Sequence, residues 1–271
     1  MDNIISMDKI PMQSILRAAG YGLIENLFPQ KKSCLFCGRH WYGSKLSAGL
    51  CPLCLIRWRQ FRRETGICPL CGSFDSGDPC RGPCAVYRER GYAKKRSLAA
   101  IYAAAPYTGV YRQRIMAFKY NGQPQLAAPL AFLMAAAWRE SGNPVRKPYL
   151  VPVPMHREKQ ETRGYNQSKL LALALSRETG FPVTELLSRP HVGQVQAGLN
   201  RWQRQTALEQ VFRWAGTVGH EPGPGPVILV DDVLTTGATL DSCGRILADH
   251  GCEPVWGLTF AGGIGAGAGV R

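Results

Sequence analysis

The sequence has few acidic residues and no long apolar run. Asp and Glu number 19 against 33 Lys and Arg, which gives a formal net charge of +14 at pH 7. The longest apolar run, residues 129–138, is much shorter than the roughly 18 residues that a membrane-spanning helix requires. Residues 1–28 lack the basic segment followed by an apolar segment that marks a secretory signal. We therefore expect a cytoplasmic protein with no membrane span.

The positive charge is concentrated in the first third of the chain. Residues 1–97 carry 16 basic and 7 acidic residues, whereas residues 98–271 carry 17 and 12. This excess favours an anionic partner such as nucleic acid or a nucleotide, but a soluble basic face explains it equally well. Apolar residues near helical spacing in 11–28 predict a helical extension over residues 1–33. The total of 271 residues suits one catalytic domain with a small appendage.

Eight of the ten cysteines lie between residues 34 and 84 in closely spaced pairs. In a reducing compartment, such pairs are zinc ligands far more often than disulfides. We predict a zinc-binding module at 34–97 with two structural Zn²⁺ ions, each held by four thiolates that leave no open position for catalysis. Sequential pairing is favoured, although the equal 13-residue gaps after the first and second pairs leave interleaved pairing open. The predicted ligands are Cys34, Cys37, Cys51, Cys54, Cys68, Cys71, Cys80 and Cys84.

Basic and aromatic residues are interleaved within the same module. Arginines could follow a nucleic-acid backbone while aromatic rings stack on bases, as in proteins that bind single-stranded DNA. A small zinc module also needs aromatic residues to cover its thin core. Both interpretations stay open for Trp41, Tyr42, Arg57, Trp58, Arg59, Phe61, Arg62, Arg63, Tyr87, Arg88, Arg90, Tyr92, Lys94, Lys95 and Arg96.

Residues 98–260 alternate between apolar strands and helical segments. This alternation predicts a parallel α/β sheet. The Gly-rich residues 261–271 are predicted to form a flexible tail. Strands are predicted at 98–105, 149–154, 183–187, 227–230 and 254–260, with a turn and helix over 107–120 and helices over 124–139, from about 166, and from 238 to 251.

The strand at 227–230 leads into the most informative stretch of the chain. Two carboxylates, Asp231 and Asp232, follow its apolar residues, and a loop of hydroxyl side chains then precedes a helix. The free N–H groups and the dipole at a helix N-terminus favour a phosphate. Ionised carboxylates instead suit sugar hydroxyls or a Mg²⁺ shared with a diphosphate. A phosphorylated sugar fits both halves, and the predicted phosphate-binding residues are Thr235, Thr236, Gly237, Ala238 and Thr239.

A basic segment follows the strand at 149–154. Its cationic residues and one histidine come before a helix that is expected to begin near Asn166. Because the carboxyl ends of parallel strands meet at one edge of a sheet, we expect this charge beside the acid pair. The sequence therefore predicts a basic loop that binds pyrophosphate through Pro154, Met155, His156, Arg163 and Gly164.

These motifs resemble two related groups of proteins. Residues 230–239 resemble the phosphoribosyl pyrophosphate (PRPP) motif of type I phosphoribosyltransferases. The cysteine pairs and residues 118–120, 151–156 and 163–167 resemble the ComF family of competence-related proteins, in which a cysteine-rich zinc module precedes a phosphoribosyltransferase domain. The resemblance covers residues 34–260 and implies a type I phosphoribosyltransferase fold for 98–260.

The resemblance also implies roles for single residues. Asp231 and Asp232 would hold the ribose 2′- and 3′-hydroxyls of PRPP, and Arg163 would stabilise the departing pyrophosphate together with Mg²⁺. These three residues are the predicted catalytic set. Residues 189–210 would form a mobile loop over PRPP, although Ala207 stands where the family commonly has Asn. The predicted loop residues that act on the ligand are Gln196, Arg201 and Arg204.

The sequence is therefore compatible with two functions. The first is a Mg²⁺-dependent phosphoribosyltransferase that transfers phosphoribose from PRPP to a nucleobase-like acceptor. The second is a non-catalytic competence protein that binds single-stranded DNA or DNA-uptake proteins and retains a PRPP or phosphate site. A homodimer is compatible with either function.

Overall fold

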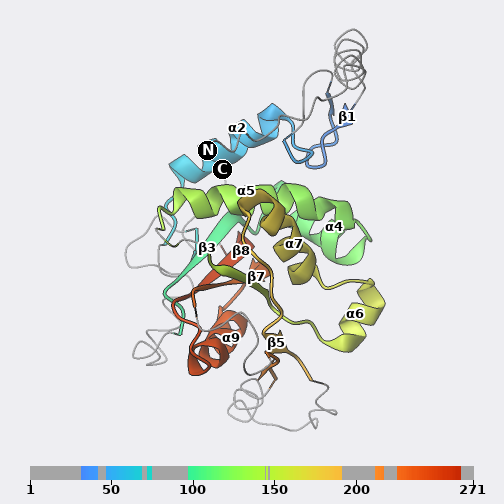
Figure 1. Ribbon diagram of the computed structural model, residues 1–271. Coiled ribbons are helices and arrows are strands. Elements are labelled where there is room, and N and C mark those ends of the chain that lie inside the picture. The colour runs from blue at the N-terminus through green and yellow to red at the C-terminus, as the bar shows by residue number, and fades with distance from the viewer. Residues whose placement is uncertain are drawn as a thin grey trace, which may run out of the picture.

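The computed structural model describes residues 32–41, 47–68, 72–74, 97–143, 145, 147–190, 211–216 and 225–263 (Figure 1). Several predictions lie outside these residues. Among the terminal segments, they concern residues 1–31 of the N-terminal extension and the Gly-rich residues 264–271. Among the site residues, they concern Cys71, Cys80, Cys84, Gln196, Arg201 and Arg204.

The centre of the fold is a four-stranded, all-parallel sheet in the order β3-β8-β7-β4. Val230 of β7 lies opposite Leu258 of β8 and Pro152 of β4. The two central strands are almost entirely apolar because layers of side chains cover both faces of the sheet. The predicted parallel α/β fold is confirmed. The strands are β3 (Ala100–Pro106), β4 (Tyr149–Pro152), β7 (Val227–Leu234) and β8 (Val255–Gly262).

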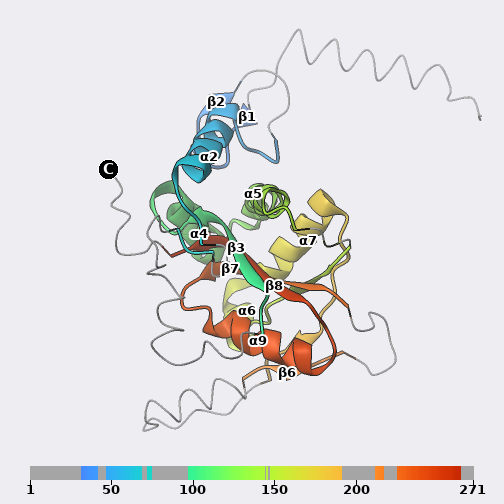
Figure 2. The same cartoon turned by 90° about the vertical axis from the view of Figure 1, so that its left-hand side faces the viewer.

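Helices cover the two faces of the sheet unequally. Figures 1 and 2 show α5 and α7 on one face and α9 on the other. Side chains of β7 alternate between the two layers, so that Ile228 joins the core under α5 and α7 while Leu229 joins the core under α9. The helices of this part of the chain are α4 (Gly109–Tyr120), η2 (Pro124–Leu126), α5 (Ala127–Glu140), α6 (Arg157–Arg163), α7 (Gln167–Thr179) and α9 (Ala238–Asp249).

Three predictions about local structure are wrong. Residues 183–187 are not a strand of the main sheet: Val183 makes one bridge to Leu150, and β5 (Leu187–Ser188) pairs antiparallel with β6 (Arg213–Trp214). The apolar character of this stretch comes from burial of Leu186 and Leu187 against the α9 layer.

The expected basic loop after β4 is instead helix α6. The Arg157 side chain pairs with Glu161 one turn later, and Gly164 ends the helix in the left-handed conformation at φ 80°. The flexible tail was expected from residue 261, but Ala261 and Gly262 are the last residues of β8 because they pair with the end of β7.

The N-terminal module contains β1 (Lys32–Ser33), β2 (His40–Trp41) and α2 (Pro52–Glu64). Helix α2 runs over α5 (Figures 1 and 2), where Arg62 forms an ion pair of 2.6 Å with Glu140. The Trp58 side chain is 2% exposed, and the ring of Phe61 packs on that of Phe74. For Trp58, Phe61 and Arg62, the structure therefore supports a role in packing.

Candidate functional site

The acid pair lies within β7. The predicted strand ended at Val230, but the ladder with β8 continues through Asp231 and Val233 to Leu234. Both carboxylates consequently sit on a fixed backbone near the carboxyl edge of the sheet. A strand positions side chains more precisely than a loop, which suits a site that must hold a sugar in one orientation.

Asp231 is held by the start of α7. The Ser168 hydroxyl donates a hydrogen bond of 2.9 Å to Oδ1 of Asp231, and the backbone N–H of Asp232 donates one of 2.8 Å to the same oxygen. Burial and the neighbouring charge of Asp232 raise the pKa of Asp231 to about 7. Asp231 can therefore change its protonation state near neutral pH.

Asp232 is held by a lysine from a distant part of the chain. The Nζ atom of Lys119 lies 2.7 Å from Oδ1 of Asp232, and the two side chains are 17% and 10% exposed. Lys119 belongs to the last turn of α4. It is a site residue that the sequence does not predict, because a single lysine in a helix gives no signal of its contact. The available signal was its place in the family-like stretch 118–120.

A second family-like stretch, residues 163–167, meets the end of α4 beside this lysine. The Tyr165 hydroxyl donates a hydrogen bond to the backbone carbonyl of Phe118. The guanidinium of Arg163 stacks over the ring of Tyr120 at 4.7 Å from its centroid, and its NH1 donates to Oε1 of Gln167 at 3.1 Å. The end of α4 and residues 163–167 thus form one contact region beside the acid pair.

The hydroxyl loop has the conformation that an anion site needs. Thr235, Thr236 and Thr239 are exposed, and Gly237 adopts φ 80° as the N-cap of α9. Gly237 has no side chain that could cap the helix, and the backbone N–H of Ala238 donates a hydrogen bond of 3.4 Å to the Thr236 hydroxyl. A helix of 12 residues whose first two residues, Ala238 and Thr239, are exposed favours a phosphate at this end.

The predicted pyrophosphate segment follows β4, the neighbour of β7. The ladder ends with Pro152 opposite Val230, and the N–H of Val153 donates to the carbonyl of Val230 at 3.0 Å. Met155 and His156 follow, partly buried, before α6 begins. Asn166 caps α7 by accepting from the N–H of Ser168, and its amide donates to the carbonyl of Val153. The carboxyl ends of β4 and β7 therefore form one edge.

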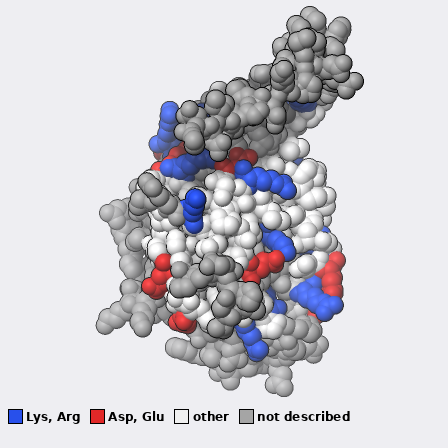
Figure 3. All heavy atoms as spheres, viewed as in Figure 1, with Lys and Arg blue, Asp and Glu red and all other residues white. Residues whose placement is uncertain are grey.

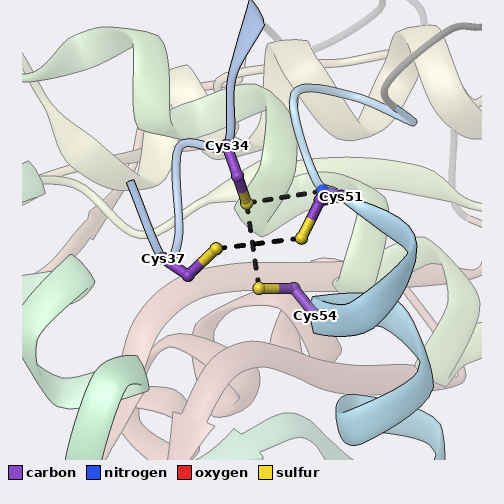
Figure 4. A group of neighbouring side chains, drawn as sticks. All are labelled: Cys34, Cys37, Cys51 and Cys54. Atoms are coloured by element: carbon purple, nitrogen blue, oxygen red, sulfur yellow. Dashed lines mark hydrogen bonds between the residues drawn. The ribbon is translucent and has the colours of Figure 1, made fainter. Parts of the chain in front are cut away.

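A second candidate site lies in the N-terminal module, where the sulfur atoms of Cys34, Cys37, Cys51 and Cys54 all lie within 4.8 Å of one another (Figure 4). The Sγ atoms of Cys34 and Cys54 are 3.7 Å apart, and those of Cys37 and Cys51 are 3.8 Å apart. A tetrahedral zinc ion with bonds of about 2.3 Å places its sulfur ligands about 3.8 Å apart, so the four thiols fit zinc. The first two cysteine pairs converge, as sequential pairing requires.

The local structure favours the thiolate at Cys34, whereas burial raises the pKa of Cys51 and of Cys54. Burial raises the pKa of Cys34, but hydrogen bonds from the backbone at Cys37 and Cys51 outweigh burial and lower this pKa to about 7. The N–H of Cys51, at the start of α2, lies 3.4 Å from Sγ of Cys34. Between the first two cysteines, the ring of Phe36 packs edge-on against Tyr111 of α4 at 6.2 Å.

The turn at Cys68 repeats the turn at Cys34. The N–H of Cys34 donates to the carbonyl of Arg39 and Gly38 donates back to Cys34, both at 2.9 Å. The N–H of Cys68 donates to Ser73 and that of Gly72 donates back to Cys68 at the same distances. Cys71, Cys80 and Cys84 lie outside the described residues, so the second zinc ion stays a prediction.

These features define the class of protein: a parallel α/β domain with an acid pair and an exposed helix N-terminus at one edge of the sheet, joined to a cysteine-rich module that fits a metal ion. No protein-family model matches the chain. Competence protein F of Haemophilus influenzae is 35% identical over 153 residues, which cover 54% of this chain and 66% of the relative. The chain thus spans about two thirds of that protein.

Two further relatives extend this likeness. Competence protein ComFC of Bacillus subtilis is 28% identical over 83% of this chain and 81% of its own length. The DNA utilization protein YhgH of Salmonella typhi is 28% identical over 57% of this chain and 68% of its own length. These relatives support the resemblance of the chain to the ComF family of competence-related proteins.

Solved structures with some similarity include two enzymes. The allosteric regulatory enzyme of purine biosynthesis is 16% identical, with a TM-score of 0.36 over 54% of this chain and 30% of its own. A hypoxanthine phosphoribosyltransferase from Staphylococcus aureus is 14% identical, with a TM-score of 0.30 over 50% of this chain and 62% of its own. Among the described residues, no helix combines the length and apolar character needed to cross a membrane.

Proposed function

We propose that the chain is a Mg²⁺-dependent phosphoribosyltransferase that binds PRPP and transfers phosphoribose to a nucleobase-like acceptor. One observation carries this proposal: Asp231 and Asp232 precede the exposed N-terminus of α9 in a single strand-loop-helix unit. Carboxylates suit sugar hydroxyls and a helix N-terminus suits a phosphate, so the unit matches the two ends of a ribose 5-phosphate.

The neighbouring strand supplies the complementary part of the site. Pro154, Met155 and His156 follow β4, which pairs with β7, and Arg163 and Gly164 end α6. In this proposal these residues receive the pyrophosphate. The 5′-phosphate and the pyrophosphate would then lie on opposite sides of a ribose whose hydroxyls are held by the two aspartates. The mobile-loop residues Gln196, Arg201 and Arg204 would complete the enclosure.

The proposed reaction is displacement of pyrophosphate from ribose C1 by a ring nitrogen of the acceptor. The bond from C1 to the pyrophosphate oxygen breaks, the bond from C1 to nitrogen forms, and the electron pair leaves with the pyrophosphate. Mg²⁺ bound with the diphosphate would supply positive charge to the leaving group. The chain itself would orient the ribose through Asp231 and Asp232, stabilise the leaving group through Arg163, and exclude water.

Calorimetric titration with PRPP tests this proposal. Wild-type protein is expected to bind PRPP in the presence of Mg²⁺, and Asp232→Asn is expected to lose most of this affinity because an amide cannot replace a charged acceptor. Asp249→Asn is the matched control, since Asp249 is an exposed residue at the far end of α9. Absence of binding by the wild type would contradict the proposal. If PRPP binds, pyrophosphate release with a panel of nucleobases distinguishes turnover from binding alone.

A second candidate function is a non-catalytic protein that binds DNA or a partner and retains the PRPP site. The names of the relatives, competence proteins and a DNA utilization protein, favour it. On the face seen in Figure 3, Lys and Arg side chains are interspersed with acidic ones and form no continuous basic patch among the described residues. On helix α2, the exposed arginines that could contact DNA are Arg57, Arg59 and Arg63.

Charge removal on α2 tests DNA binding without dismantling the fold. Deletion of residues 1–97 would uncover the core that Phe36 and Trp58 share with the sheet, so substitutions are the better experiment. Replacement of Arg57, Arg59 and Arg63 by Ala is expected to weaken binding of a labelled single strand and to reduce its salt dependence. Unchanged affinity would rule out this face of the module as the DNA-binding surface.

A further inference from the structure

We propose that Lys119 is a binding residue of the PRPP site, whose ammonium group leaves Asp232 for the diphosphate when the ligand binds. This inference rests on the proposed function and adds a residue to it. Its starting point is the 2.7 Å contact between Nζ of Lys119 and Oδ1 of Asp232, made by two side chains that are 17% and 10% exposed.

A largely buried ion pair such as this one is expected to contribute little to the stability of the fold. Removing a carboxylate and an ammonium from water costs several kcal/mol, and their attraction often does no more than offset that cost. The pair also lies beside the oxygens that are proposed to accept ribose hydroxyls. Sugar binding therefore competes with Lys119 for Oδ1 of Asp232, and the lysine needs another anionic partner once the sugar is in place.

The backbone at Lys119 is fixed, but its side chain is long. The carbonyl of Phe118 accepts a hydrogen bond from the Tyr165 hydroxyl, and the Phe118 side chain is fully buried. The last turn of α4 therefore cannot withdraw from the site easily. The four-carbon stem of a lysine can still carry its ammonium group several ångströms by rotation, and its three donors suit phosphate oxygens.

The second cation of the proposed site is Arg163, which lies against Tyr120, the residue after Lys119 in α4. Arg163 stacks over Tyr120 at 4.7 Å and is oriented by Gln167, which is fully buried. Lys119 and Tyr120 share the last turn of α4, so we infer that a diphosphate at the Arg163 guanidinium comes within reach of the extended Lys119 side chain. Two cations from separate segments would then hold the diphosphate, and part of the charge required from Mg²⁺ would come from the chain.

Lys119 also reduces the repulsion between the acid pair and an anionic ligand. Two adjacent carboxylates would oppose the approach of PRPP, and the lysine neutralises one of them. In agreement with this role, the Lys119 charge lowers the pKa of Asp231, against the larger effects of burial and Asp232. Before the ligand binds, the lysine would offset the negative charge of the two carboxylates. After the ligand binds, it would contact the diphosphate.

The test is calorimetric titration of PRPP into wild-type protein, Lys119→Met and a matched control, each at several Mg²⁺ concentrations. Lys169→Met is the control because Lys169 also forms a lysine ion pair, 2.6 Å from Glu185, but is 45% exposed on α7. We expect Lys119→Met to weaken PRPP binding at least tenfold and to need more Mg²⁺ for half-maximal binding. Lys169→Met should stay within twofold of the wild type.

The outcomes separate this inference from the proposed function. If the wild type binds PRPP and Lys119→Met binds it equally well or more tightly, Lys119 only occupies Asp232 and the inference is wrong. If the wild type does not bind PRPP, the proposed function fails and the inference fails with it. Lys119→Gln, which keeps a hydrogen bond to Asp232 without the charge, should also lose affinity, and thermal melting confirms that each variant is folded.

Discussion

The indole Nε1 of Trp58 donates a hydrogen bond of 2.8 Å to the backbone carbonyl of Ala104. Trp58 belongs to α2 of the cysteine-rich module, and Ala104 belongs to β3, an edge strand of the sheet. Arg62, one turn further along α2, donates to the carbonyls of Ala103 and Ala104. The module therefore binds to the edge strand β3, whose backbone groups would otherwise be available for pairing with another chain.

Replacement of Trp58 should destabilise the whole protein. Trp58→Phe keeps most of the apolar volume but removes one of the two donors to the Ala104 carbonyl, because Arg62 still donates to it, at a cost of about 0.5–1.5 kcal/mol. Trp58→Ala also leaves a cavity and should cost about 3–5 kcal/mol. Chemical denaturation measures both effects. Arg59→Ala, an exposed neighbour on α2, is the control and should stay within about 0.5 kcal/mol of the wild type.

The parallel sheet and the acid pair could be predicted from the sequence because their signals are local. The apolar run 227–230, the two aspartates and the hydroxyl loop follow one another in the chain, and the structure keeps them in one strand-loop-helix unit. The segment 183–187 was misassigned because buried apolar residues look alike in the sequence, whether they join a ladder or pack beneath a helix.

Contacts between distant segments could not be predicted in the same way. Lys119 reaches Asp232 across more than a hundred residues of chain, and no local pattern marks this contact. Tyr165 and Phe118 are likewise joined only by the fold. Helix α6 was missed because its seven residues are polar and carry no apolar periodicity, so only the Gly164 stop gave a signal.

Metal removal should act on the first cysteine cluster in a predictable way. We expect about two zinc ions per wild-type chain from the eight paired thiols, and Cys37→Ser should lose about one of them. Cys37 is exposed, so loss of its side chain creates no cavity and any destabilisation reflects the missing ion. Metal analysis of purified protein measures the content. Cys252→Ala, a buried cysteine outside the cluster, should leave the zinc content unchanged.

The raised pKa of Asp231 predicts the pH dependence of stability. A carboxyl group whose pKa rises from its usual value near 4 to about 7 on folding keeps a proton that the unfolded chain releases between those pH values. The free energy of unfolding therefore falls as pH rises from about 4 to 7, by at most about 1.4 kcal/mol per pH unit from this group. Asp231→Asn should remove this decrease.

Urea denaturation at a series of pH values between 5 and 8 measures the effect. The difference in unfolding free energy between Asp231→Asn and the wild type should grow in favour of the variant as pH increases. Asp249→Asn is the control because Asp249 is exposed, and it should run parallel to the wild type. A constant difference between Asp231→Asn and the wild type at all pH values would show that Asp231 titrates outside this range.

The conformation of Gly237 links stability to the proposed phosphate site. Its φ of 80° lies in the left-handed region, where a Cβ atom costs about 1–2 kcal/mol. Gly237→Ala should therefore destabilise the protein by about this amount and weaken PRPP binding, because the strain shifts the N–H groups that open α9. Gly263→Ala is a matched control, since a Cβ there meets nothing within 4 Å and its backbone is outside the left-handed region. Thermal melting and PRPP titration of both variants separate the two effects: equal affinity of Gly237→Ala and the wild type would show that the phosphate does not bind at this turn.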